Sequence, residues 1–88
     1  MLTPPILIHS PKELALMVVN QREKLKLSQA EVGRRVGLKQ QTISEFEIKP
    51  ESTKLDTLFR ILSAVNLDVG VLTKNQTNKI ESGWKEEW

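Results

Sequence analysis

The chain has no cysteine, one histidine and no long apolar run among its 88 residues. Without cysteine it forms no disulfide and no thiolate metal site, which fits a reducing compartment, and we expect a cytoplasmic protein. His9 alone cannot complete a metal site or a catalytic triad, and glycine-rich phosphate loops and clustered carboxylates are also lacking. We therefore expect no enzymatic activity, metal, cofactor or small-molecule substrate. Nor do we expect membrane association, since neither a membrane-length apolar run nor a signal-peptide pattern is present.

Positive charge is concentrated in one part of the chain, although the net charge is only +2. Six basic and two acidic residues lie between Arg22 and Lys39, whereas six basic and eight acidic residues follow Lys39. Such a basic region is suited to neutralising phosphates. A solvated face of lysine and arginine would give the same pattern, so charge alone does not decide between the two interpretations.

Helix signals run through residues 10–66, which we predict to be a folded domain preceded by an N-terminal arm at residues 1–9. Residues 10–13 read Ser-Pro-Lys-Glu and residues 28–31 read Ser-Gln-Ala-Glu, both typical of capped helix starts. Apolar residues at helical spacing follow each run, and Gly37 suits the left-handed residue that ends a helix. Further on, Pro50 ends a third helix, and a wide apolar stripe predicts a fourth: Leu55, Leu58, Phe59, Leu62 and Val65.

A short turn containing Gly37 separates two of these helices, which is the signature of a helix-turn-helix. In the second helix of that pair, residues 40–48, Ile43 and Phe46 lie three apart and can turn towards a core. The outward side then carries uncharged amide and hydroxyl groups from Gln40, Gln41 and Ser44. Such groups donate and accept hydrogen bonds at once, so they suit a surface that reads base edges.

Residues 67–72 alternate apolar with polar or small side chains, which predicts a β-strand. The chain offers this strand no convincing partner, so we predict that it pairs with the same strand of a second copy through Leu67, Val69 and Val71. The alternative is an extended segment that packs on the fourth helix.

Residues 73–88 have the composition of a flexible tail, yet they contain both tryptophans of the chain. Tryptophan is costly to expose and is favoured as an interface anchor. We therefore predict that Trp84 and Trp88 bind another protein, the alternative being that the tail folds back on its own domain.

The span 10–66 resembles the Xre/Cro-repressor class of DNA-binding proteins. The resemblance rests on Leu27-Ser28-Gln29-Ala30-Glu31-Val32, Gly37, Gln41-Thr42-Ile43-Ser44, Glu47 and the stripe Leu55, Leu58, Leu62. It implies a mostly α, lambda-repressor-like helix-turn-helix bundle of four to five helices, to which the predicted C-terminal strand of a homodimer is added. In this class the glutamine matching Gln29 binds a phosphate or supports the reading helix, and Arg22 and Glu47 match an ion pair.

More narrowly, the whole chain is similar to HipB-type antitoxins. The similarity rests on the helix Lys39-Gln40-x-Thr42-Ile43-Ser44-x-Phe46-Glu47, the short strand after the fourth helix and the polar tail ending Glu87-Trp88. It implies the antitoxin of a type II toxin–antitoxin operon, a repressor of its own operon that also neutralises a HipA-type serine/threonine kinase toxin. A stand-alone phage-type Cro/repressor without a toxin partner is the alternative. Gln41 is larger than the residue expected there, and Ile48-Lys49 replaces a glycine found in many class members.

The predicted DNA site is a palindromic double-stranded operator, with the N-terminal end of helix 40–48 in the major groove. The predicted base-reading residues are Lys39, Gln40, Gln41 and Ser44. Phosphate contacts are predicted for Ser28, Gln29, Arg34, Arg35 and Thr42.

Overall fold

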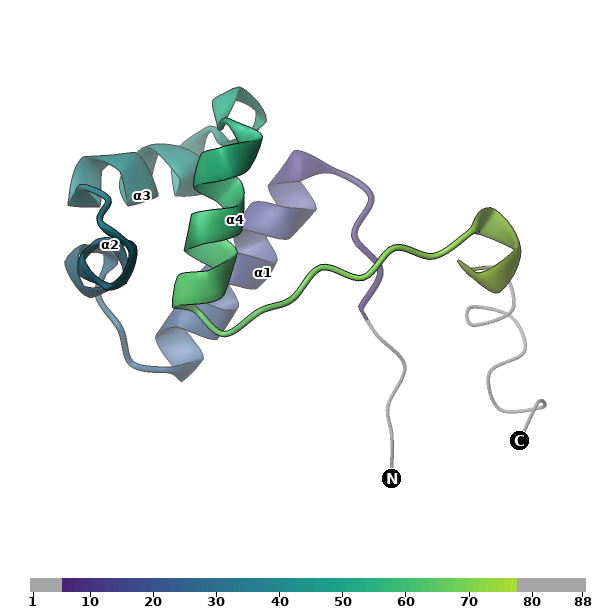
Figure 1. Cartoon of the computed structure of the whole chain (residues 1–88), viewed down its shortest axis with the longest axis horizontal. Helices are drawn as coiled ribbons and strands as arrows, with labels where there is room; N and C mark the ends of the chain where they lie inside the picture. Colours follow the sequence, from purple (N-terminus) through teal and green to yellow (C-terminus); the bar gives the residue numbers. More distant parts are fainter. Residues whose placement is uncertain (1–5, 78–88) are drawn as a thin grey trace.

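The computed structural model describes residues 6–77 of the chain, and within them four α-helices and one short 3-10 helix form a bundle (Figure 1). Residues 74–77 add a helical turn after the bundle. The mostly α helix-turn-helix bundle predicted from the sequence is confirmed. The helices are α1 (Pro11–Lys24), α2 (Gln29–Val36), α3 (Gln40–Ile48), η1 (Pro50–Ser52) and α4 (Leu55–Ala64).

Both predicted capped starts are present, with one difference in their bonding. At α2, Ser28 Oγ accepts from the Glu31 backbone N–H at 3.1 Å, and the Glu31 carboxylate accepts from the Ser28 N–H at 2.8 Å. At α1, Ser10 Oγ likewise accepts from the Glu13 N–H at 3.1 Å, but the Glu13 carboxylate accepts from the N–H of His9 at 2.7 Å. The second start is thus a complete capping box, and the first holds the residue before its cap instead.

The core lies where the four helices meet and contains side chains from each of them. The buried hydrophobic side chains are those of Ala15, Val18, Val32, Ile43, Phe46, Ile61, Leu62, Ala64 and Val65. Ile43 and Phe46 are 0% and 2% exposed, so α3 is held through the two residues that its spacing predicted. The stripe predicted for α4 is only partly inward, because Leu55 and Phe59 are 70% and 54% exposed.

Beyond α4 the chain leaves the bundle as a stretched segment (Figure 1). In the single chain, residues 67–73 have no regular secondary structure. The predicted strand needs a second copy to pair with, so the dimeric strand stays a prediction. Trp84 and Trp88 lie outside the described residues, as does most of the predicted tail. Within residues 6–77 no helix has both the length and the apolar character that crossing a membrane requires.

Candidate nucleic-acid interface

The turn between α2 and α3 packs directly against α2. The Leu38 backbone N–H donates to the Gly33 carbonyl at 2.8 Å, and a Cβ built on Gly33 would lie 2.3 Å from the Leu38 carbonyl oxygen. Any side chain at this position of α2 would therefore collide with the turn. Gly37 ends α2 in the left-handed conformation, with φ of 72°, which glycine adopts without strain.

The inward and outward faces of α3 are separated as the sequence predicted. Lys39, Gln40 and Gln41 are exposed at the start of the helix, and Ser44 is half-buried one turn later. Gln41 Nε2 donates to the Glu45 carboxylate at 3.4 Å, one turn along the same helix. The structure thus places three of the predicted base-reading residues at the N-terminal end of α3 and the fourth, Ser44, one turn further along.

An ion pair anchors the opposite end of α3 to α1. The Arg22 guanidinium donates to the two carboxylate oxygens of Glu47, from Nε at 2.7 Å and from Nη2 at 3.2 Å. The side chains are only 15% and 9% exposed, respectively. Arg22 Nη1 also donates to the Leu27 carbonyl at 3.0 Å, between α1 and α2. The ion pair that the family resemblance implied is confirmed.

Gln29 links this ion pair to the reading end of α3. Its Nε2 donates to Glu47 Oε1 at 2.8 Å, and its Oε1 accepts from Gln40 Nε2 at 3.3 Å. Hydrogen bonds therefore run from Arg22 through Glu47 and Gln29 to Gln40. Of the two roles that the resemblance allowed for Gln29, the support of the reading helix is the one seen in the structure.

The two arginines of α2 differ in their contacts. Arg35 Nη1 donates to the Ala64 carbonyl at the end of α4, at 3.0 Å, while Arg34 has no hydrogen bond to any residue in 6–77. Both are exposed. Hydrogen bonds from Ser28 hold the pKa of Glu31 below its ordinary value, and the nearby arginines lower it further. The start and outer face of α2 thus combine an N-terminal helix end with two cations.

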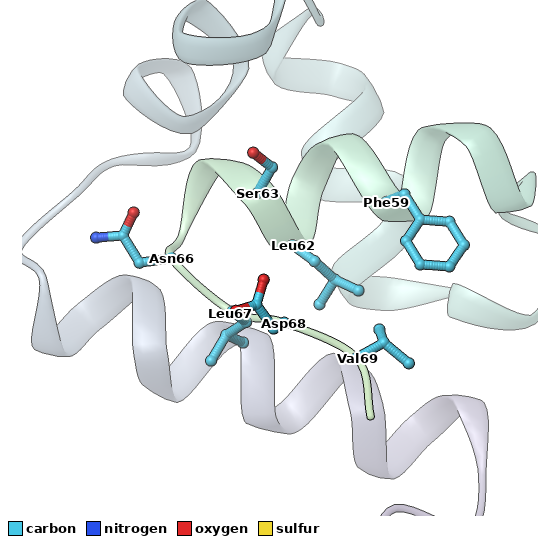
Figure 2. A pocket seen from close by; sticks show the side chains of 7 residues that line it. All are labelled: Phe59, Leu62, Ser63, Asn66, Leu67, Asp68 and Val69. Carbon is cyan, nitrogen blue, oxygen red and sulfur yellow. The ribbon is translucent and has the colours of Figure 1, made fainter. Parts of the chain in front are cut away.

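The predicted dimer residues lie on the segment after α4 and differ in exposure. Leu67 packs against the core, whereas Val69 and Val71 are 54% and 90% exposed. Figure 2 shows Val69 across a pocket from Leu62 and Phe59 of α4. Phe59 was not predicted to be a surface residue, because its helical spacing fits the apolar stripe of α4 equally well.

No group of three or more histidine, aspartate or glutamate side chains in the described part of the chain could hold a metal ion.

Known proteins resemble this chain in sequence and in fold. The helix-turn-helix family matches residues 20–72. The antitoxin HipB of Escherichia coli K12 is 34% identical over 82 residues, which are 92% of this chain and 93% of that protein. The chain belongs to the HipB antitoxins of the helix-turn-helix family.

Solved structures of HipB resemble this HipB-type chain closely. A HipB variant in complex with an O2 20mer superposes with a TM-score of 0.76 at 36% identity, over 80% of this chain and 97% of that one. HipB in a HipA-HipB-O2-O3 complex superposes with a TM-score of 0.75 at 35% identity, over 77% of this chain and 96% of that one. The likeness therefore covers the bundle and most of the relatives' described length.

The candidate sites of this HipB-type chain lie in separate parts of the sequence. Base-reading and phosphate candidates lie on α2, α3 and the residues that precede each helix. The candidate dimer residues follow α4, and the tryptophans lie beyond the described residues. Sequence reasoning missed the side chains that hold the end of α4, namely Gln21 and Arg35, because their carbonyl partners are 44 and 29 residues away.

Proposed function

We propose that the chain is a DNA-binding repressor and the antitoxin of a type II toxin–antitoxin operon. It acts as a homodimer in the cytoplasm, without catalysis of its own, and it neutralises a HipA-type serine/threonine kinase. The observation that carries the proposal is α3, which is anchored by the Arg22–Glu47 ion pair while Gln40 and Gln41 are exposed and Ser44 is half-buried. The HipB relatives, one of them in a complex with HipA, support the toxin partner.

The chemistry of α3 suits direct reading of the major groove. Gln40 and Gln41 carry amides that bond the donor–acceptor edge of adenine, Ser44 is a shorter and more versatile contact, and Lys39 reaches a guanine or a phosphate. Glu45 is exposed on the same helix and repels phosphates, so α3 must enter by its N-terminal end with Glu45 lifted away from the backbone.

Phosphate contacts then fix the register of the domain on the duplex. Arg34 has the simplest role, since it is exposed and has no hydrogen bond to the rest of residues 6–77. Arg35 uses one of its five guanidinium N–H groups on Ala64 and keeps its charge. The full set proposed for phosphate contact is Ser28, Gln29, Arg34, Arg35 and Thr42.

Dimerisation is proposed through the segment after α4. Val69 and Val71 expose apolar surface, and the backbone of residues 67–72 has one hydrogen bond among the described residues, from the Leu67 N–H to Leu62. An edge of this kind is suited to pairing with a second copy about a two-fold axis, and a two-fold dimer reads a palindrome.

Binding to the DNA immediately upstream of the chain's own reading frame tests the repressor function, with a scrambled duplex of equal length as the control. We expect binding tighter than to the scrambled duplex by about a thousandfold or more, and falling steeply as salt rises. Equal affinity for the two duplexes, or binding that does not depend on salt, would contradict the proposal.

Deletion of residues 73–88 tests the toxin partner. It should leave DNA binding nearly unchanged and abolish capture of the kinase encoded by the adjacent reading frame, and the full chain with Trp84→Ala and Trp88→Ala should behave like the deletion. Capture that survives the deletion would show that the tail does not bind the partner. DNA binding without capture by the intact chain would favour a stand-alone repressor.

A further inference from the structure

The C-terminus of α4 is held by side chains from two other helices. Arg35 Nη1, from α2, donates to the Ala64 carbonyl at 3.0 Å, and Gln21 Nε2, from α1, donates to the Val65 carbonyl at 3.0 Å. The last carbonyls of a helix have no partner within the helix and commonly bond to water or to a local cap. Here, long side chains from other parts of the chain take the last two.

The same helix end also sets the direction in which the chain leaves the bundle. Asn66 adopts a left-handed conformation, with φ of 61°, and the Leu67 N–H donates back to the Leu62 carbonyl at 2.9 Å. This is the bonding of a helix-terminating motif, in which one left-handed residue ends the helix and changes the direction of the chain. Since Val65 is fully buried, the turn is fixed to the core, and Gln21 and Arg35 tie it to α1 and α2.

We propose that Arg35 and Gln21 are positioning residues that fix the direction of residues 67–72 relative to α2 and α3. This rests on the proposed function, in which residues 67–72 join two copies and α3 reads DNA. The direction of the segment then sets the distance between the two reading helices, and so the spacing of the half-sites that the dimer accepts.

The geometry of an extended segment makes the spacing sensitive to this helix end. Six extended residues span about 20 Å, so a tilt of about 10° at their start moves their end by about 3.5 Å. Successive base pairs are about 3.4 Å apart along the duplex. A tilt of this size at the end of α4 therefore changes the half-site spacing by about one base pair.

Replacing Gln21 tests the positioning role without removing a possible phosphate contact. Arg35 could serve both roles, because only one of its N–H groups bonds to Ala64. Gln21 has no charge, is half-buried and lies on α1, outside the helix-turn-helix. A change of spacing preference on replacing Gln21 therefore cannot come from a lost phosphate contact. Arg34, the exposed neighbour of Arg35, is the matched control for lost charge.

The first test measures the segment directly and needs no DNA. Because the chain has no cysteine, spin labels at Glu45→Cys on α3 and Lys74→Cys beyond the segment are unique, and excess unlabelled chain removes distances between copies. Gln21→Met and Arg35→Met should each broaden or shift the distance distribution by about 3 Å, and Arg34→Met should not. The proposal is overturned if the wild-type distance distribution is as broad as those of the variants, or if both Met variants give the wild-type distribution.

The second test measures half-site spacing on the duplex that the wild type selects, with one base pair inserted or removed at its centre. The wild type should lose about tenfold or more in affinity, comparable to a mismatched base pair. Gln21→Met and Arg35→Met should reduce this loss severalfold, Arg35→Lys should largely restore it, and Arg34→Met should weaken every duplex alike. Unchanged spacing preference in both Met variants overturns the proposal.

Two controls keep these tests decisive. Thermal unfolding identifies variants that do not fold; if Arg35→Met is one of them, Gln21→Met and Arg35→Lys carry both tests. If the wild type binds no duplex in a sequence-specific way, the proposed function is wrong, and the label distances still decide whether the two side chains position the segment.

Discussion

Replacing Gly33 by alanine probes how tightly the turn between α2 and α3 places the reading helix. The new Cβ would lie 2.3 Å from the Leu38 carbonyl oxygen and 3.2 Å from its carbonyl carbon. The neighbour is backbone, so no side chain can rotate away. The Leu38 N–H also donates to the Gly33 carbonyl at 2.8 Å, so the turn and α2 would have to separate against that bond.

Two opposing effects set the size of the change. Overpacking of a close contact costs about 1–3 kcal/mol, and alanine in place of glycine within a helix recovers about 1 kcal/mol. Because the contact is short and the neighbour cannot move, we expect a net loss of about 2 kcal/mol for Gly33→Ala. In a domain of this size that lowers the melting temperature by about 10 °C.

Urea and thermal unfolding measure the loss, and DNA binding by the folded variant measures its effect on α3. Gly70→Ala is the control for stability, because nothing lies within 4 Å of its Cβ, and a change within about 1 kcal/mol is expected. Gly33→Ala should weaken DNA binding even where the variant is fully folded. A Gly33→Ala protein as stable as the wild type, or more stable, would refute the close approach of the turn.

Two other changes test the candidate site and its support. Gln40→Ala should cost about 1–3 kcal/mol at one base position and relax the preference there, as measured on a series of operator variants; an unchanged preference would rule out that contact. The lowered pKa of Glu31 makes its capping box contribute stability above the ordinary glutamate pKa of about 4.3, a contribution lost as the pH falls through the lowered value. Urea unfolding across this pH range should show that the free energy of unfolding falls less with acid for Glu31→Gln than for the wild type. An equal fall in both proteins would contradict the role of the Glu31 carboxylate in the capping box.

The parts of the fold that could be predicted from the sequence are those with local causes. The capping box between Ser28 and Glu31 involves residues three apart, and Gly37 ends α2 because glycine adopts its backbone angles without strain. The inward turn of Ile43 and Phe46 follows from helical spacing. Each of these features depends on a few neighbouring residues, so the sequence carries its signal.

The contacts that the sequence did not predict join distant helices. Arg35 has the charge and exposure of a phosphate ligand, and nothing near it in the sequence indicates its hydrogen bond to Ala64. Phe59 has the spacing of a core residue, yet it is 54% exposed because Ile61 and Val65 place the inward face of α4 to one side of it. Periodicity shows that a helix has an apolar face, while the packing of the other helices decides how much of that face they cover.

In the hydrogen bonds that join Glu47, Gln29 and Gln40, the donor and the acceptor of each bond are fixed. An ionised carboxylate only accepts hydrogen bonds, so Gln29 must turn its Nε2 towards Glu47 and its Oε1 towards Gln40. Gln40 must then donate through Nε2, as it does at 3.3 Å. Its Oε1 and its second N–H are left for a base edge, which is the acceptor and donor pair that bonds adenine.

Replacing the carboxylate by an amide would remove that constraint while keeping the shape of the side chain. In Glu47→Gln the new amide can donate as well as accept, so Gln29 can bond to it in either orientation and no longer fixes Gln40. We expect Glu47→Gln to weaken the base preference at the position read by Gln40, but by less than Gln40→Ala weakens it. Binding to scrambled DNA should change little. Undiminished preference at that position, in a variant that folds, would show that the charge of Glu47 does not orient the reading side chain.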